Sequence, residues 1–200
     1  MNYSELQSQI ASTIGRSDLT AEIVEVIATL ETELSLGLRC AELQNTATLT
    51  KEVDGSFTLP DDFVEMMRVR VNGDDIEQMN PEVADTADFS PVAFYMLGST
   101  LHIRTEPDDE DTVVIDYYKR VPALSDSSPT NLLLTRYPTV YITGCMLYLK
   151  LLIQDLEEAQ AYGERFNSLL QAVNKLNARR RGKPRLSTSY VLGQGYTPAV

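Results

Sequence analysis

The 200-residue sequence has no tryptophan, one histidine and two cysteines. The single histidine, His102, lies between Leu101 and Ile103 in a strand-like segment. A Ser-His-Asp or Cys-His catalytic arrangement would have to be built on His102, which we interpret as structural or solvent-facing. Cys40 and Cys145 are far apart in apolar helical patterns, so we expect buried free thiols, in keeping with a reducing compartment or with indifference to the redox state of the compartment. These scarcities argue against an enzyme.

Motifs that bind phosphate or metal are also missing. The segment Gly193-Gln194-Gly195 is followed by neither a helix nor a third glycine, and we interpret it as flexible backbone. The acidic run at residues 108–111 could attract calcium, but it lacks the ligand spacing of a calcium loop, which favours a solvated turn. We therefore predict no catalytic residue, no metal site and no cofactor.

Long hydrophobic runs are absent as well. The longest apolar stretch, residues 140–153, is too short and too interrupted to span a bilayer. The opening MNYSELQSQI lacks the basic and apolar regions of a signal peptide. We expect a soluble protein that is made in the cytoplasm and has no membrane partner.

Basic residues are few and unevenly placed. With 43% apolar and 23% charged residues the chain should fold, as one domain or a pair of small ones. Its net charge of −12 argues against a surface that binds nucleic acid throughout. Residues 165–200 hold seven Lys or Arg and no acidic residue, which leaves 10 basic and 29 acidic residues, a charge of −19, to residues 1–164. The body and the tail are therefore expected to meet different partners, although basic residues also complement a helix C-terminus.

Two amphipathic helices are predicted at the start of the chain. Ser4 is the expected N-cap of the first helix, which ends at Gly15. Thr20 is the expected cap of the second helix, which closes at Gly37. The second helix has one apolar stripe, and the glutamates, including Glu31, are assigned to its other faces. Each stripe needs a partner, and the candidates lie near the other end of the sequence.

The middle of the chain, from about residue 46 to 119, alternates with period two and is predicted to be β structure. Asp54-Gly55 and Asn72-Gly73 are typical of tight hairpin turns. Strands this short and closely spaced favour an antiparallel sandwich or barrel-like module. The predicted strands cover residues 46–53, 57–59, 67–71, a short segment from 76, 94–97, 101–104 and 112–119.

Helical patterns resume after a polar loop. Pro138 is expected in the first turn of a helix that runs to about Gln154, with Leu152 on its apolar face. A last helix is predicted from about residue 155 to 178, and Leu156 opens its apolar stripe. The predicted fold class is therefore α+β. A four-helix bundle is built from both chain ends (residues 1–45 and 122–181), with an inserted antiparallel β module (46–121) and an extended C-terminal arm (182–200).

The C-terminal arm and the residues before it carry the clearest candidate binding site. Five cations could bind phosphates, but no aromatic residues alternate with them to stack bases. The same charges would suit an acidic protein surface, and the later apolar and aromatic residues could add a strand or fill a groove. A frayed terminus is the alternative. The candidate residues are Arg179, Arg180, Arg181, Lys183, Arg185, Tyr190, Leu192 and Tyr196.

One segment is more specific than these patterns. Residues 121–149 read VPALSDSSPTNLLLTRYPTVYITGCMLYL. This segment resembles the signature of the phage head-tail adaptor family typified by the SU10 adaptor. Residues 3–39 and the stretch FTLPDDFVEMMRVRV in the β region also resemble that family in content and order. The resemblance covers most of the chain from Tyr3 to about Arg180.

The resemblance implies a structural virion protein in the neck, between capsid and tail. It implies a self-assembled ring, with twelve copies matching the portal, that sits below the portal protein. The ring would join the capsid vertex to a tail or nozzle protein, and DNA would pass through its channel without sequence-specific binding. The helical bundle would form the ring, and the β module would face outward or toward the tail.

The signature segment also departs from the family. Leu132 stands where an aromatic residue, usually Trp, is expected, and we expect Leu132 to fill an apolar pocket in its place. The C-terminal arm has no clear counterpart, and we predict that it binds the portal or a neighbouring subunit. The first alternative function is another neck, tail-completion or tail-tube ring protein. The second alternative is a nucleic-acid-binding regulator. The residues assigned to the signature loop and helix start are Pro122, Leu124, Asn131, Leu132, Tyr137 and Pro138.

Overall fold

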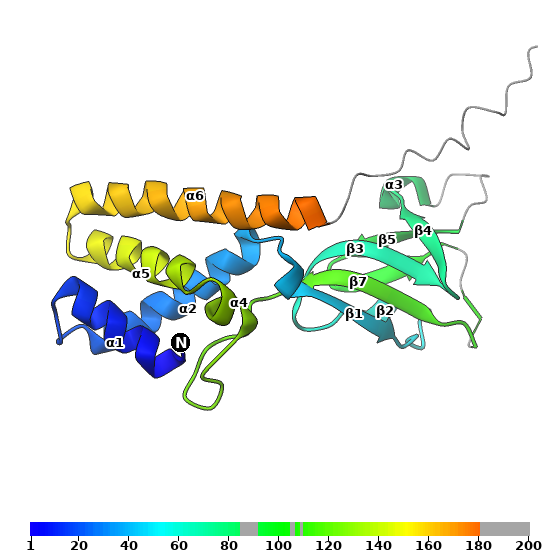
Figure 1. The fold of residues 1–200 in the computed structure, drawn as a ribbon. Coiled ribbons are helices and arrows are strands. Elements are labelled where there is room, and N and C mark those ends of the chain that lie inside the picture. Colours follow the sequence, from blue (N-terminus) through cyan, green and yellow to red (C-terminus); the bar gives the residue numbers. More distant parts are fainter. Residues whose placement is uncertain (85–91, 105–106, 109, 181–200) are drawn as a thin grey trace, which may run out of the picture.

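The computed structural model describes residues 1–84, 92–104, 107–108 and 110–180. Helices from both ends of the chain lie at one side of the molecule, and the strands from the middle lie at the other (Figure 1). This arrangement confirms the α+β class. The helices are α1 (Tyr3–Ile14), α2 (Thr20–Gly37), α3 (Pro81–Ala84), α4 (Leu132–Arg136), α5 (Pro138–Leu152) and α6 (Leu156–Arg180), with a 3-10 turn η1 (Ala41–Leu43). The strands are β1 (Gln44–Leu49), β2 (Phe57–Thr58), β3 (Phe63–Val71), β4 (Asp74–Gln78), β5 (Ala93–Leu97), β6 (Thr100–Ile103) and β7 (Val113–Lys119).

The first two helices begin differently from the prediction. Asn2, not Ser4, caps α1, because its side chain accepts the backbone N–H of Glu5 at 2.9 Å while the Glu5 carboxylate accepts the N–H of Asn2 at 2.9 Å. Gly15 ends α1 with a left-handed φ of 71°, as predicted. Thr20 is the first residue of α2 and its side chain makes no cap. The glycine signal for the end of α1 was therefore specific. The polar signal for its start was not, because Asn2 and Ser4 can both act as an N-cap.

Helix α5 lies in the middle of the helical part, which comprises α1, α2, α4, α5 and α6. It packs against α1, α2 and α6 and shares one apolar core with them. The helices approach closely at Gly144 of α5, where an added Cβ would lie 2.5 Å from a methyl of Leu30 and 2.9 Å from the ring of Phe166. Helices from the two ends of the sequence therefore bury their apolar faces together.

The β part, made of β1 to β7 and α3, forms one sheet with the order β1-β7-β3-β4-β5-β6-β2. All neighbours are antiparallel except β4 and β5, which pair in parallel. The wholly antiparallel module is therefore wrong at this pair, because the 14 residues between the two strands are enough for the crossover connection that parallel strands need. A bridge between Lys51, two residues after β1, and Phe57 of β2 links the two edges of the sheet, so the sheet is a nearly closed barrel.

The strand boundaries follow the predicted turns. Asn72 and Gly73 have φ values of 52° and 94°, and they join β3 to β4 as the Asn-Gly signal predicts. Strand β3 begins at Phe63, four residues before the predicted start at Met67, because bulges in β3 let Phe63 pair with Lys119 at the end of β7. The barrel interior is filled by apolar residues of both halves of the sheet, among them Leu49, Phe57, Val69, Phe94, Leu101, Val113, Ile115 and Tyr117.

The apolar faces of α5 and α6 are shorter than predicted. Leu152 is 54% exposed and Leu156 is 68% exposed, although both were expected on buried stripes. Helix α5 ends at Leu152 and α6 begins at Leu156, so both residues lie at the end of the helical part that is remote from the sheet. These two leucines belong to the surface.

Candidate functional site

The first part of the signature segment, residues 121–138, connects the last strand to α5 and runs along α2. Its backbone is held by two buried side chains of α2 that lie one turn apart. The N–H of Val121 donates to the hydroxyl of Ser35 at 3.0 Å. The N–H of Leu124 donates to both carboxylate oxygens of Glu31 at 3.1 and 3.2 Å. Side chains thus satisfy backbone groups that regular structure leaves unpaired.

Asn131 extends this contact into a buried network. Its carbonyl oxygen caps α4 by accepting the N–H of Leu134 at 2.7 Å. Its amide donates to the carbonyl of Pro122 and to the hydroxyl of Tyr141, both at 2.8 Å. The Tyr141 hydroxyl donates in turn to Glu31 at 3.2 Å. The network ties the start of the segment, α4, α5 and α2 together.

Glu31 is the ionisable centre of the network. Its residue is 5% exposed, although the sequence assigned it to a polar face of α2. Burial raises the pKa of Glu31 to about 7, because desolvation of the carboxylate outweighs the hydrogen bonds from Leu124 and Tyr141. Burial also raises the pKa of the Tyr141 hydroxyl and of the Cys145 thiol, which feels the Glu31 charge. The buried carboxyl of Glu31 therefore holds the backbone of the signature segment at Leu124.

The other signature residues have distinct places. Leu124 is buried and Tyr137 is partly buried against the helical core. Pro138 is the first residue of α5, as predicted. Leu132, however, is 60% exposed, so the prediction that it fills an apolar pocket is wrong. It is the first residue of α4, and the next two residues occupy the core.

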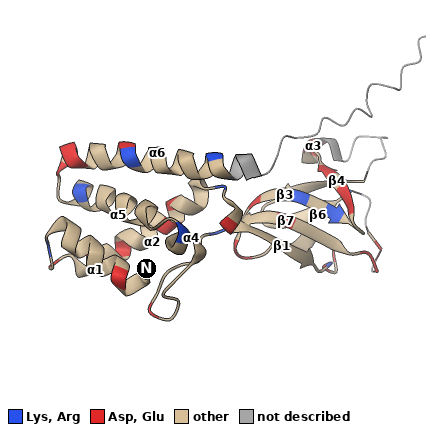
Figure 2. Cartoon of the chain, viewed as in Figure 1, with Lys and Arg blue, Asp and Glu red and all other residues tan. Residues whose placement is uncertain are grey.

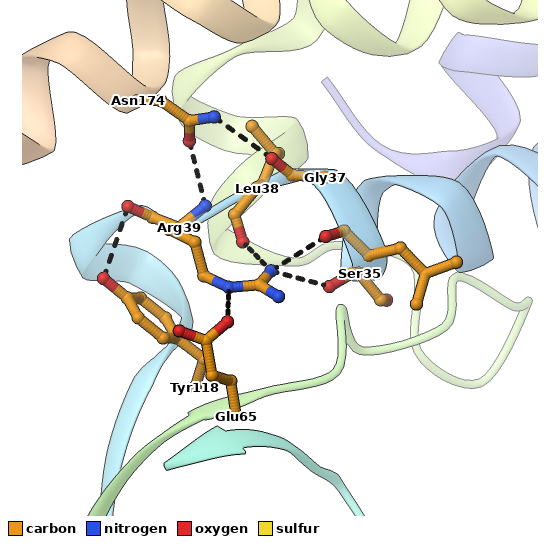
Figure 3. A network of polar contacts seen from close by, with 8 residues as sticks. Ser35, Gly37, Leu38, Arg39, Glu65, Tyr118 and Asn174 are labelled. Atoms are coloured by element: carbon orange, nitrogen blue, oxygen red, sulfur yellow. Dashed lines mark hydrogen bonds and ion pairs between the residues drawn. The ribbon is translucent and has the colours of Figure 1, made fainter. Parts of the chain in front are cut away.

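Arg39 lies where the chain passes from the helical part to the β part (Figure 3). Its Nε donates to a carboxylate oxygen of Glu65 on β3 at 2.6 Å. One terminal nitrogen donates to three carbonyls at the end of α2, at 2.8 to 3.2 Å. The guanidinium also lies 5.5 Å from the ring centre of Tyr118 on β7. One side chain thus contacts α2 and two strands.

The backbone of Arg39 adds the last helix to the junction. Its N–H donates to the side chain of Asn174 on α6 at 2.9 Å, and the Asn174 amide donates to the carbonyl of Gly37 at 3.1 Å. The Tyr118 hydroxyl donates to the Arg39 carbonyl at 3.5 Å. Glu42 of η1, three residues after Arg39, forms an ion pair with Arg136 of α4. The junction fixes the helical part against the sheet.

Replacing Arg39 by lysine is expected to lower the free energy of unfolding by about 1–2 kcal/mol, because an ammonium cannot reproduce the planar set of donors. Urea unfolding followed by circular dichroism measures the change. Arg16→Lys is the matched control, since the Arg16–Asp18 pair is exposed and the unfolding midpoint should stay where it is. Equal midpoints for Arg39→Lys and wild type would contradict the role of Arg39 at the junction.

The arm residues predicted to bind partners are not part of this geometry. Arg181, Lys183, Arg185, Tyr190, Leu192 and Tyr196 lie outside the described residues. Arg179 and Arg180 end α6, and their side chains also lie outside the description. Their role in binding a portal or a neighbouring subunit stays a prediction.

The described residues also locate the other candidates. The His102 ring stacks on Tyr95 with 5.1 Å between ring centres, and its Nε2 lies 3.1 Å from the Thr100 hydroxyl. Both cysteines are buried and free. Within these residues, no group of three or more His, Cys, Asp or Glu side chains is placed to hold a metal ion. In the same part of the chain, no helix combines the length and the apolar character that a membrane span requires.

Comparison with known families gives one decisive match. The family model described as SU10 adaptor protein matches residues 1–189. The chain belongs to the SU10 adaptor protein family. The match covers the helical part, the β part and the beginning of the C-terminal arm, so the resemblance of the signature segment is confirmed. A search of curated proteins found no match.

Membership places this SU10 adaptor among the structural proteins of phages. A phage adaptor is a virion component that interacts with other head or tail proteins. For an adaptor, the buried network and the Arg39 junction have a structural purpose, because both fix the relative positions of elements that come from distant parts of the sequence.

Proposed function

We propose that this adaptor forms a ring of twelve copies below the portal protein in the phage neck. The ring joins the capsid vertex to a tail or nozzle protein and lines the channel through which DNA leaves. The observation that carries this proposal is the match of residues 1–189 to an adaptor family. Assembly takes place in the host cytoplasm.

The shape of the subunit supports a ring. A closed ring needs interfaces in which one patch of a subunit meets a different patch of its neighbour. The helical part and the β part offer unlike surfaces, and the Arg39 junction holds them in one arrangement. In the proposed ring, α1, α2, α5 and α6 act as a four-helix bundle that forms the wall, and the β part faces outward or toward the tail.

The charge distribution supports a DNA conduit. Residues 1–164 carry 10 basic and 29 acidic residues. Acidic residues occur in both the helical and the β part (Figure 2). An acidic channel wall repels phosphates and lets DNA pass without sequence-specific contacts. The basic residues from Arg179 to Arg185 are proposed to bind the portal or a neighbouring subunit.

Electron microscopy of the adaptor mixed with its purified portal tests the proposal. We expect an added ring of twelve subunits below the portal. Truncation of the chain after Arg181 is expected to weaken portal binding, and unchanged binding would remove the proposed contact between the arm and the portal. A lack of association with the portal, together with DNA affinity that falls steeply with salt, would replace the proposal with a nucleic-acid-binding regulator.

A further inference from the structure

An apolar groove lies between α2 and α5, at the end of the helical part that is remote from the sheet. It has a volume of about 420 Å³. Its apolar lining comes mainly from the end of α5, where Leu151 is 47% and Leu152 54% exposed. The other lining residues used below are Glu22, Glu25, Val26 and Tyr148. Exposed leucines beside a groove indicate a surface that another segment covers.

The acidic side of the groove restricts what that segment can be. Glu25 is exposed on the α2 side. One carboxylate oxygen of Glu22 is inaccessible to solvent and has no hydrogen-bond partner. Burial of that oxygen leaves the negative charge of Glu22 only partly neutralised, and a nearby cationic N–H group would stabilise the charge. The groove therefore suits a segment that carries both basic and apolar side chains.

The C-terminal part of this chain has that composition. Arg181, Lys183 and Arg185 come first, and Val191 and Leu192 follow within ten residues. No acidic residue occurs anywhere from residue 165 to the end. The groove offers carboxylates and exposed leucines, and the chain end offers basic residues followed by apolar ones. The two are therefore complementary in charge and in apolar character.

The position of the chain end favours a neighbour's groove. Helix α6 begins beside the groove at Leu156 and ends near the β part (Figure 1). Its 25 residues span roughly 37 Å, so the arm leaves the subunit at the end opposite to its own groove. In the proposed ring a neighbouring subunit supplies a second groove, and the 20 residues from 181 to 200 can span at most about 70 Å.

We propose that the groove between α2 and α5 receives the C-terminal arm of a second copy of this chain. Arginine or lysine side chains of the arm pair with Glu22 and Glu25, and its apolar residues cover Leu151 and Leu152. The proposal rests on the proposed ring for the placement of the two copies. It assigns the arm a subunit-to-subunit contact in the ring and gives that contact a specific receiving surface.

Chemical crosslinking between two full-length variants tests the contact. Leu151→Cys places a thiol in the groove, and Val191→Cys places one in the arm. The two variants are mixed in equal amounts, with and without purified portal, and treated with a short bismaleimide. We expect a crosslinked dimer that contains one copy of each variant, formed at least about tenfold faster than in controls. The native thiols, Cys40 and Cys145, are buried and react slowly.

Ser12→Cys on α1 is the matched control for the groove variant, because Ser12 is exposed and lies outside the groove. Adding Glu22→Lys to the groove variant should slow crosslinking at least about fivefold, since it reverses the charge that meets the arm. Equal rates for the groove and control variants, with portal and without it, would overturn the proposal. Crosslinks confined to single chains of a Leu151→Cys and Val191→Cys double variant would overturn the second-copy assignment.

The outcomes separate this inference from the proposed function. Rings that form below the portal without a groove-to-arm crosslink leave the ring in place and reject the groove contact. A groove-to-arm crosslink between copies that never associate with the portal supports the contact and rejects the position in the neck.

Discussion

Replacing Glu31 by glutamine is expected to stabilise the adaptor at neutral and higher pH and to leave its stability in acid close to that of wild type. Burial raises the pKa of Glu31 to about 7 in the folded protein, from an ordinary value of 4.5. Between these values the unfolded chain has lost the Glu31 proton while the folded chain still holds it. The wild type therefore loses stability as pH rises through this window, by up to about 3 kcal/mol. Glutamine has no proton to lose.

Urea unfolding of both proteins from pH 4 to pH 8 measures the effect as a difference in unfolding free energy at each pH. Other carboxylates change the stability of both proteins alike, so they cancel in the difference. Tyr141 and Cys145 face Glu31, and their raised pKa values keep them neutral in this range. Glu25→Gln, on the exposed side of the same helix, is the control and should give a flat difference. Parallel curves for Glu31→Gln and wild type would contradict the burial of a carboxylate at this position.

Replacing Gly144 by alanine is expected to lower the free energy of unfolding by about 1–3 kcal/mol, although alanine is the better helix former. The added Cβ would lie 2.5 Å from one methyl of Leu30 and 2.9 Å from the other, and also 2.9 Å from the ring of Phe166. Leu30 is completely buried, so it cannot move aside without disturbing its neighbours. The substitution therefore pushes α5 away from Leu30 of α2 and Phe166 of α6.

Gly163→Ala on α6 is the matched substitution. The nearest atom to an added Cβ there is a methyl of Leu147 at 3.5 Å, an ordinary contact. This variant should gain about 0.5–1 kcal/mol from helix propensity alone. Thermal and urea unfolding of the two variants measure the effect of the same Gly→Ala change at a closely packed position, Gly144, and at a less crowded one, Gly163. A stabilised Gly144→Ala variant would show that the close approach of the three helices is not required.

The features that could be predicted from the sequence are those decided by neighbouring residues. The turn at Asn72-Gly73 and the helix end at Gly15 were correct, because a positive φ is required there and few residues adopt it. The period of apolar residues gave the α+β class and the order of helices and strands. The cap at Ser4 was wrong because Asn2 offers the same chemistry two residues earlier.

The features that were missed depend on residues far away in the chain. Glu31 looks like a surface residue of α2, since its partners Leu124 and Tyr141 lie about a hundred residues further on. The parallel pairing of β4 with β5 joins residues 16 positions apart, so no tight-turn signal between the strands could reveal it. A faint signal existed: Glu31 and Ser35 are one turn apart, next to the apolar stripe that faces the core. Polar residues in such positions are candidates for holding a neighbouring backbone.

The contacts of Arg39 have a mechanical consequence. Two helices and two strands meet around this residue, so a tilt imposed on the sheet reaches α2 and α6 directly. The helical part and the sheet are then expected to move together as one stiff body. A displacement of the sheet is therefore passed on to α2 and α6 and is not absorbed between the two parts.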